Sequence, residues 1–328
     1  MIKIIPNASL ALGIIFYKER KDMAGNKIRS MHILKKETFV AYLFVAPALI
    51  LFLLFVGYPL VASFYLMFCD YNLITSPQFV GLKNILKFLG DKEVPLVMMS
   101  SLKLLLVLVP AHVILGLALA CLVHRTGKKM STAYRIILYI PTIMTTVSVA
   151  TAWSYLYDTD FGVINYFLEK LGIDKIPWLN SSVWAFWAIV IFSIWKFVGT
   201  PFLYYYIGLQ NIPTSLYEAA EIDGANRWQM IRHITLPALV PMITVMLLLS
   251  VGSIMRSDTG LFYQVTRNSG ILYPTTQVID SYVLNAIFKN SNFGFTAATS
   301  FFQSIVGLLL MLFANGMVRK IAPENALF

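Results

Sequence analysis

Charged residues are scarce in this 328-residue chain. Only 13% of its residues are Asp, Glu, Lys or Arg, whereas 58% are hydrophobic and the mean hydropathy is +0.71. A soluble globular domain carries about 25% charged residues, most of them on its surface. The composition therefore excludes an ordinary soluble protein and indicates a chain that spans a lipid bilayer.

Catalytic and nucleotide-binding motifs are also missing. The sequence has no Gly-x-x-x-x-Gly-Lys-Ser/Thr loop, so the chain lacks the phosphate-cradling loop that it would need to hydrolyse ATP on its own. It has no Gly-x-Ser-x-Gly nucleophile elbow, and its four histidines are not spaced as metal ligands. We therefore predict no enzyme activity, no catalytic residue, no metal site and no cofactor in this chain.

Six apolar segments are long enough to cross the hydrocarbon core, which takes about 20 helical residues. They lie near residues 39–68, 100–123, 136–157, 183–207, 236–255 and 297–317. We predict an all-α polytopic membrane protein with six transmembrane helices. Its parts are an N-terminal extension (1–38), a transmembrane domain (39–317) and a tail (318–328). The two cysteines, Cys69 and Cys121, fall at opposite ends of their spans, so no disulfide is expected.

The lysines and arginines predict the orientation, because short cytoplasmic loops carry the excess of them. They are concentrated in residues 1–38, in the loop near 124–135, in a polar segment before the fifth span and in the tail. Both termini are therefore predicted to be cytoplasmic. Membrane topology also explains the net charge of +10 better than nucleic-acid binding does. The apolar stretch at 7–17 is too short to span, and we expect a cytoplasmic extension there rather than a removable signal peptide.

The polar segment between the fourth and fifth spans has helix signals of its own. Ser215 and Glu218 have the spacing of a capping box, which predicts that a helix begins at Ser215. Gly224 is expected to end that helix. Asn226, followed by Gln229, predicts a second short helix that runs to the proline at the start of the fifth span.

The side chains of this segment suit a groove on a partner. Three alanines would allow close approach and three large apolar side chains would otherwise face water: Ala219, Ala220, Ala225, Trp228, Ile231 and Ile234. An amphipathic helix laid into a partner's cleft is a recurring mode of recognition. The alternative is that the same helices pack beneath their own bundle, with Glu218 serving only as a cap.

The run Glu218-Ala-Ala-x-x-Asp223-Gly-Ala is followed by Ile234-Thr-Leu-Pro237. This pattern resembles the signature loop of the permease subunits of binding-protein-dependent ABC importers. The chain departs from it at Ile231, where that family commonly has Phe. Both side chains are large and apolar, so the docking role that the resemblance implies is retained.

The resemblance covers roughly residues 35–328 and is strongest to the carbohydrate-uptake branch, which shares the run Phe-Val-Gly-Leu-Lys-Asn at 79–84. It implies the type I importer permease fold, also called MetI-like, and a location in the plasma (inner) membrane. It also implies several partners: a second homologous permease subunit, two cytoplasmic ATPase subunits that bind ATP and Mg, and an extracellular solute-binding protein. A sugar would pass between the two permeases. The chain itself would contact membrane lipid and would bind no nucleic acid.

The resemblance further implies that residues 215–235 form coupling helices seated in a groove of an ATPase subunit. The residues expected to carry this coupling are Glu218, Ala219, Ala220, Asp223, Gly224, Ala225, Arg227, Trp228, Ile231, Ile234, Leu236 and Pro237.

Candidates for the solute pathway follow from residue types. Sugars are bound by aromatic faces and planar polar groups, and a cation inside a span is costly unless it snorkels or lines water. The candidates are Trp153, Tyr157, Trp195, Lys196, Ser250, Gly252, Ser253 and Arg256. For Lys196 the alternative is snorkelling or a bond between helices. The small residues of the fifth span equally suit close helix packing.

The competing hypothesis is an ion-coupled secondary transporter or a membrane scaffold protein. An ion-coupled carrier usually binds its proton or sodium ion through ionisable or carbonyl groups near the middle of the membrane. The six predicted spans contain no Asp or Glu. Their absence favours the ATP-driven importer.

Overall fold

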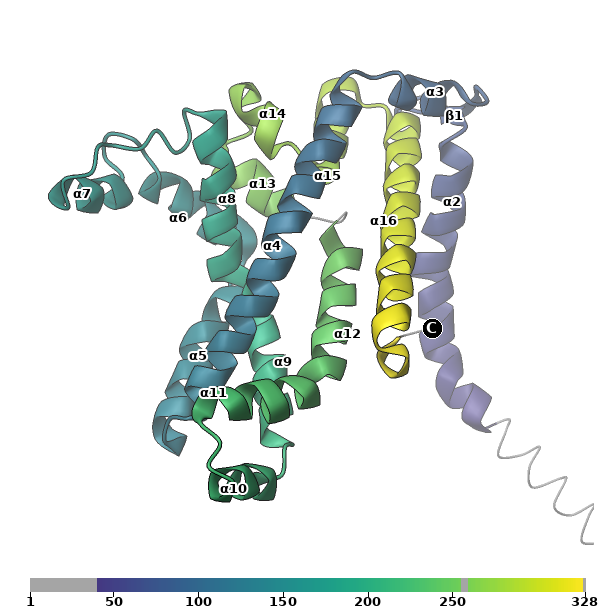
Figure 1. Cartoon of the computed structure of the whole chain (residues 1–328). Coiled ribbons are helices and arrows are strands. Elements are labelled where there is room, and N and C mark those ends of the chain that lie inside the picture. Colours follow the sequence, from purple (N-terminus) through teal and green to yellow (C-terminus); the bar gives the residue numbers. More distant parts are fainter. Residues whose placement is uncertain (1–39, 255–258, 327–328) are drawn as a thin grey trace, which may run out of the picture. The chain divides into compact units, whose positions relative to one another are not determined.

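The computed structural model describes residues 40–254 and 259–326, most of which are helical (Figure 1). The chain divides into two compact units, residues 1–63 and 64–328. The extension predicted for residues 1–38 lies outside the described residues. The described part of the first unit is a helix that begins at Val40 and contains the π-helical turn η1 (Leu53–Gly57). None of residues 40–63 is buried.

The remaining elements follow in chain order. They are α2 (Tyr58–Leu66), β1 (Cys69–Asp70), β2 (Gln78–Phe79), α3 (Lys83–Leu89), α4 (Glu93–His124), α5 (Lys128–Ile143), α6 (Thr146–Leu156), α7 (Val163–Lys170), α8 (Ser182–Phe197), α9 (Gly199–Gln210), α10 (Thr214–Ile222), α11 (Arg227–Met230), η2 (Ile231–Thr235), α12 (Leu236–Ile254), α13 (Thr259–Val265), η3 (Gly270–Leu272), α14 (Tyr273–Thr276), α15 (Ile279–Asn290), α16 (Phe293–Ile321) and η4 (Pro323–Asn325).

Membrane spans can be assigned from helix length and composition. Among the described residues, four helices are long and apolar enough to cross a bilayer: Val40–Leu66, Glu93–His124, Arg227–Gly252 and Phe293–Lys320. Two pairs of helices are long and apolar enough when each pair is taken together, α5 with α6 at a bend of 96° and α8 with α9 at a bend of 41°. Counting each pair as one span gives the six that the sequence predicts.

The third and fourth spans each contain a proline that favours a kink, Pro141 and Pro201, and the structure has a bend in each span. α5 ends at Ile143 because Met144 and Thr145 take extended backbone conformations, with ψ of 147° and 128°. α8 ends at Phe197, four residues before Pro201. A proline ring clashes with the carbonyl four residues earlier and cannot donate to it, which accounts for the second bend.

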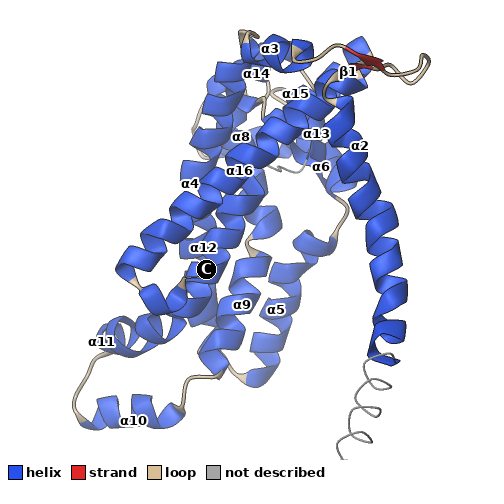
Figure 2. Cartoon of the chain, turned by 90° about the vertical axis from the view of Figure 1, so that its right-hand side faces the viewer, coloured by secondary structure: helices blue, strands red, loops and turns tan. Residues whose placement is uncertain are grey.

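The second unit has two distinct ends. α10 and α11 lie at one end, and α3 and α14 lie at the other (Figures 1 and 2). At the end with α3, β1 pairs antiparallel with β2. The buried Asn84 side chain donates to the carbonyls of Met67 and Cys69, at 3.1 and 2.8 Å. The run at 79–84 thus ties the chain that follows α2 to the start of α3.

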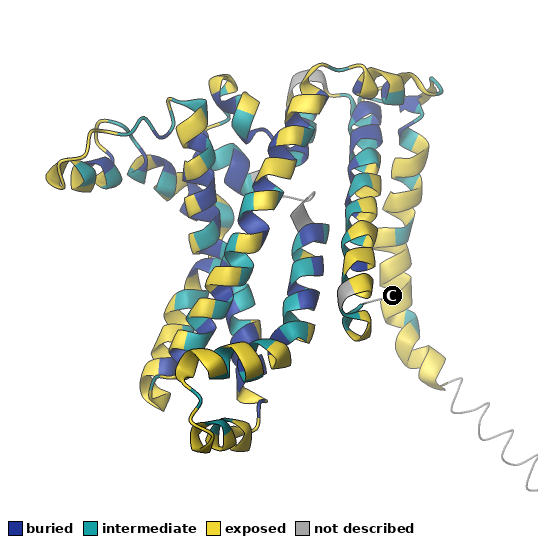
Figure 3. Cartoon of the chain, viewed as in Figure 1, coloured by how far each residue is buried: buried dark blue, intermediate teal, exposed yellow. Residues whose placement is uncertain are grey.

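Three apolar clusters hold the helices of the second unit together. Figure 3 shows where buried residues (dark blue) lie along these helices. The first joins α4, α6, α8 and α13, the second joins α4, α9 and α12, and the third joins α3, α4, α15 and α16. Both cysteines are free, as predicted. α15 packs inward through Ile279, Tyr282 and Ala286.

The loop between the third and fourth spans is organised by one buried amide. The Asn165 side chain donates to the carbonyls of Thr159 and Ile176, at 3.0 and 2.9 Å. Its oxygen accepts from the Ile176 amide at 3.2 Å and from the Trp178 indole at 3.1 Å. Four hydrogen bonds through one side chain therefore hold α7 and residues 176–178 in place.

Replacing this amide should loosen the loop. We expect Asn165→Ala to lower the free energy of unfolding by about 2 kcal/mol, because it leaves buried donors and acceptors without partners. Thermal unfolding of the purified protein and the rate of proteolysis within residues 158–182 would measure the effect. Asn180→Ala is the control, since its bond to Thr159 is exposed. Equal melting temperatures for the two variants would contradict this account.

Candidate functional site

α10 and α11 form a hairpin that is closed by a glycine. After α10 ends, the Gly224 amide donates to the Glu221 carbonyl at 3.1 Å and the Ala225 amide donates to the Ala220 carbonyl at 2.9 Å. Gly224 has a φ of +77°. These two bonds and the left-handed residue make a Schellman motif, in which glycine is favoured because it carries no side chain. The prediction that Gly224 ends the first helix is confirmed.

The start of α10 differs from the prediction. The helix begins at Thr214, and the residue before it, Pro213, makes no side-chain capping bond. Ser215 therefore lies within the first turn and Glu218 lies deeper in the helix. The predicted capping box between these two residues is wrong, because the proline, with its fixed φ, leads the chain into the helix one residue earlier.

The second helix begins as predicted. The Gln229 amide donates to Asn226 Oδ1 at 2.9 Å, and the Asn226 amide donates to Gln229 Oε1 at 2.7 Å, which completes a capping box. The helix does not stop before Pro237, however. It passes through the π-helical turn η2 into α12, so that Arg227–Gly252 is continuous. The wider turn accommodates a proline that has no amide hydrogen to donate.

A hydroxyl pair joins the two arms of the hairpin. Tyr217 Oη on α10 and the buried Thr235 Oγ1 in η2 lie 2.9 Å apart. The tie holds the connection between the arms to one geometry. Nothing in the sequence pattern indicates it, since the two hydroxyls are 18 positions apart.

The outer face of the hairpin is exposed. Trp228 is 68% exposed and Ile222 is 87% exposed. Within residues 40–254 and 259–326, no hydrogen bond or ion pair engages the exposed Glu218 carboxylate. Of the other predicted coupling residues, five are exposed (Ala219, Asp223, Gly224, Arg227 and Pro237) and five are half-buried (Ala220, Ala225, Ile231, Ile234 and Leu236). This exposure disfavours the alternative in which the hairpin packs beneath its own bundle.

Ile222 was not among the sequence candidates. It lies four residues after Glu218, and two such residues share one face of a helix. Ile222 lies between the acidic residues Glu221 and Asp223, so it does not belong to an apolar pattern in the sequence. The spacing from Glu218 is the signal that could have found it.

Two hollows flank the hairpin. One of about 430 Å³ lies where it meets the end of α4, and it is lined by Cys121, His124, Arg125, Leu209, Tyr217, Glu221, Arg227, Met230, Ile231 and Thr235. The other, of about 320 Å³, lies inside the hairpin and is lined by Ala220, Asp223, Gly224, Ala225, Gln229, Met230, His233 and Ile234. The half-buried coupling residues Ala220, Ala225, Ile231 and Ile234 thus line concave surfaces.

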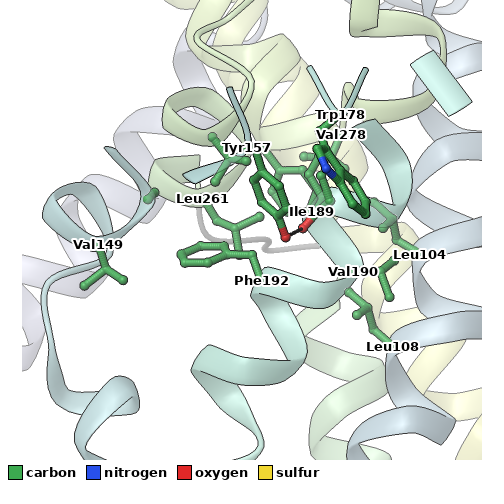
Figure 4. Close-up of a cluster of buried hydrophobic side chains, with 14 residues drawn as sticks. Leu104, Leu108, Val149, Tyr157, Trp178, Ile189, Val190, Phe192, Leu261 and Val278 are labelled. Carbon is green, nitrogen blue, oxygen red and sulfur yellow. Dashed lines mark hydrogen bonds between the residues drawn. The ribbon is translucent and has the colours of Figure 1, made fainter. Parts of the chain in front are cut away.

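The predicted pathway aromatics form one group near the first apolar cluster. The Trp153 ring centroid lies 5.4 Å from that of Tyr157 and 5.1 Å from that of Trp195. Tyr157 is 0% exposed, and its hydroxyl donates to the Ala188 carbonyl at 2.8 Å (Figure 4). Tyr157 is therefore the buried member of this group and packs against Trp153. Trp195, at 38% exposed, remains accessible to a solute.

Lys196 is 1% exposed. Its Nζ donates to the carbonyls of Pro141 and Met144, at 3.1 and 2.8 Å. It also lies 5.3 Å from the ring centroid of Phe197. This geometry corresponds to the alternative of a bond between helices, and it places the ammonium group away from water.

Only some of the fifth-span candidates lie within the described residues. Ser250 and Gly252 are half-buried in α12, and a Cβ on Gly252 would make ordinary contact with Met311 of α16. The packing against α16 therefore does not require a glycine at position 252. The side chain of Ser253, and Arg256 as a whole, lie outside the described residues.

Comparisons with known proteins identify the family. Residues 112–324 match the family described as binding-protein-dependent transport system inner membrane component. The probable ABC transporter permease protein YesP of Bacillus subtilis is 34% identical over 300 residues, which cover 88% of this chain and 95% of YesP. The trehalose/maltose transport system permease protein MalF of Thermococcus litoralis is 35% identical over 217 residues, which cover 65% of this chain and 72% of MalF.

A solved structure agrees with these relatives. One chain of a bacterial alginate ABC transporter, crystallised in complex with an alginate pentasaccharide-bound periplasmic protein, aligns with a TM-score of 0.76 and 26% identity. The alignment covers 87% of this chain and 96% of that one. This chain therefore belongs to the family of binding-protein-dependent transport system inner membrane components. It is a multi-pass ABC importer permease, as the polar segment indicated.

The Schellman motif gives a measurable consequence. We expect Gly224→Ala to destabilise the end of α10 by about 1 kcal/mol, because a left-handed backbone is unfavourable for alanine. A Cβ there would meet no atom within 4 Å, so the cost is conformational only. Faster hydrogen exchange at the amides of Gly224 and Ala225 would report it. Gly127→Ala is the control, because Gly127 has a φ of −60° and open space. Unchanged exchange in Gly224→Ala would contradict the motif.

Proposed function

We propose that this chain is the transmembrane permease subunit of an ATP-driven ABC importer for sugars, chiefly oligosaccharides. It forms half of the translocation pathway beside a second homologous permease in the plasma (inner) membrane, with both termini in the cytoplasm. Two cytoplasmic ATPase subunits bind ATP and Mg and carry out the hydrolysis. An extracellular solute-binding protein delivers the sugar.

The exposed hairpin of α10 and α11 is the observation that carries this proposal. Large apolar side chains such as Trp228 and Ile222 are costly to leave in water, and clusters of them mark interaction sites. Glu218 adds a carboxylate on the same face as Ile222. Arg125, Arg227 and neighbouring basic residues lie at this end of the second unit, which favours its placement on the cytoplasmic side.

Two observations support a sugar as the solute. The relatives named above are named for trehalose and maltose, and for alginate. In this chain, Trp195 presents a partly exposed ring that packs against Trp153 at a tilt of 45°. Aromatic faces of this kind pack against the C–H surfaces of sugars. We therefore propose Trp195 and Trp153 as solute contacts, with Tyr157 behind them.

Loss of the exposed carboxylate should uncouple the importer. In the complete complex reconstituted in liposomes, we expect Glu218→Ala to lower sugar uptake and solute-stimulated ATP hydrolysis by about tenfold, the effect of removing one interface hot spot. Basal hydrolysis by the ATPase subunits should be unchanged. Glu169→Ala is the matched control, because Glu169 is exposed in α7, outside the hairpin, and its ion pair with Lys175 is exposed too.

Wild-type coupling in Glu218→Ala would reject the assigned docking face. A second control separates coupling from backbone strain, since Gly172 and Gly224 share a φ of +77° and both have open space. Gly172→Ala should transport normally, whereas Gly224→Ala should be impaired. Uptake driven by an ion gradient in liposomes that hold only this chain would instead establish the competing secondary transporter.

The aromatic contact can be tested on one helix. We expect Trp195→Ala to raise the sugar concentration needed for half-maximal uptake by about three- to tenfold, because one ring contact of this kind contributes roughly 1 kcal/mol. Trp187→Ala is the control, because Trp187 is a comparably exposed aromatic residue on α8 that makes an edge-to-face contact with Phe186 instead. Equal effects of the two substitutions would remove Trp195 from the pathway.

A further inference from the structure

The two broken spans meet at their breaks. α5 ends at Ile143 and α8 ends at Phe197, and the residues beside these two ends are bonded to each other in both directions. Lys196 Nζ donates to the carbonyls of Pro141 and Met144, and Thr142 Oγ1 donates to the carbonyl of Lys196 at 2.9 Å. Bends in two different spans thus form a single joint.

The joint is also closely packed. A Cβ on Gly199, the first residue of α9, would lie 2.4 Å from the Leu138 carbonyl oxygen and 3.0 Å from the Cα of Tyr139. The backbones of α5 and α9 therefore approach as near as a glycine allows. A side chain at this position would force the two helices apart.

Lys196 supplies what the first break needs. A helix that ends leaves its last carbonyls without intrahelical donors, and those carbonyls carry the negative end of the helix dipole. Within a span there is no bulk water to satisfy them. An ammonium group offers several donors and a positive charge, so it satisfies the carbonyl of Pro141 in the last turn of α5 and that of Met144 in the break, which no apolar side chain can do.

The joint lies between the exposed hairpin and the proposed solute contacts. On one side, α9 leads through residues 211–213 directly into α10, the first arm of the exposed hairpin. On the other side, α6 carries Trp153, and α8 carries Trp195 one residue before Lys196. A displacement of the hairpin that travels along α9 meets this joint before it reaches the proposed solute contacts.

We propose that Lys196 is a positioning residue that locks the two breaks together, so that α5, α6, α8 and α9 move as one body when the hairpin is displaced. The inference rests on the proposed function. It assigns to Lys196 a role in transmitting the displacement of the hairpin to the spans. Lys196 touches no solute in this account. It acts by fixing the angle between α5 and α6.

The test uses the complete reconstituted complex. Lys196→Met keeps an unbranched apolar stem of four heavy atoms and removes the ammonium group. We expect assembly and basal ATP hydrolysis to be retained, while uptake and solute-stimulated hydrolysis fall about tenfold, within the range of measured coupling effects. Lys196→Arg keeps the charge and the donors and should recover most of the uptake. Lys103→Met is the matched control, because Lys103 is an exposed lysine within α4.

A second variant guards against failure to fold. Thr142→Val removes only the reciprocal bond to the Lys196 carbonyl and should give a smaller loss of coupling. The double variant should be no worse than Lys196→Met alone, because both substitutions act on one joint. Wild-type coupling in Lys196→Met, or in Thr142→Val where Lys196→Met does not assemble, would overturn the inference.

A distance measurement tests the joint without reference to transport. Spin labels at Ala133 in α5 and Ala152 in α6, both exposed, would report the separation across the break in a background of Cys69→Ala and Cys121→Ala. We expect one narrow separation, the same with and without a non-hydrolysable ATP analogue, and a broadened one in Lys196→Met. A wild-type separation that changes with nucleotide would overturn the rigid joint. Absence of ATP-driven uptake by the wild-type complex would instead refute the proposed function.

Discussion

Backbone hydrogen bonding inside the bilayer is the constraint on which the rest of this structure depends. An unpaired carbonyl in hydrocarbon costs several kcal/mol, so a span can break only where other groups replace the lost helical donors. The 96° break between α5 and α6 has such replacements in Lys196 and in the exchange between Thr142 and Lys196. The buried lysine and the broken span therefore explain each other. The cation is tolerated because carbonyls surround it, and the break is tolerated because the cation is there.

The same constraint shapes the start of the fifth span. Pro237 cannot donate a backbone hydrogen bond, and in many helices it would mark an end. Here the chain takes a π-helical turn just before the proline and continues, so the hairpin and the span share one helix from Arg227 to Gly252. Local pattern predicts a stop at this proline. The tertiary structure favours continuity, because Thr235 in the same turn is buried and tied to Tyr217.

Sequence reasoning recovered the elements whose signals are local. Six apolar segments, the glycine that ends α10 and the capping box of Asn226 with Gln229 each depend on residues a few positions apart, and all three are found in the structure. The failures concern distant partners. Nothing near Lys196 or Tyr157 in sequence shows that the carbonyls of Met144 and Ala188 would receive their hydrogen bonds. The capping box predicted for Ser215 is wrong for a different reason, because the same helix begins at Thr214, directly after Pro213.

The stiffness of the hairpin bears on how movement could pass through this family's membrane subunit. A flexible loop would lose conformational entropy on docking and would absorb part of any displacement. This hairpin is instead fixed at its turn by Gly224, at its second start by Asn226 and Gln229, and across its arms by Tyr217. Its exposed face belongs to helices that continue towards two spans, through α9 on one side and α12 on the other. A displacement of Trp228 is therefore transmitted to α12 along an unbroken helix. A displacement of Glu218 is transmitted to α9 and then to the joint at Lys196. The docking face that we propose would thus have two mechanical outputs within the same subunit.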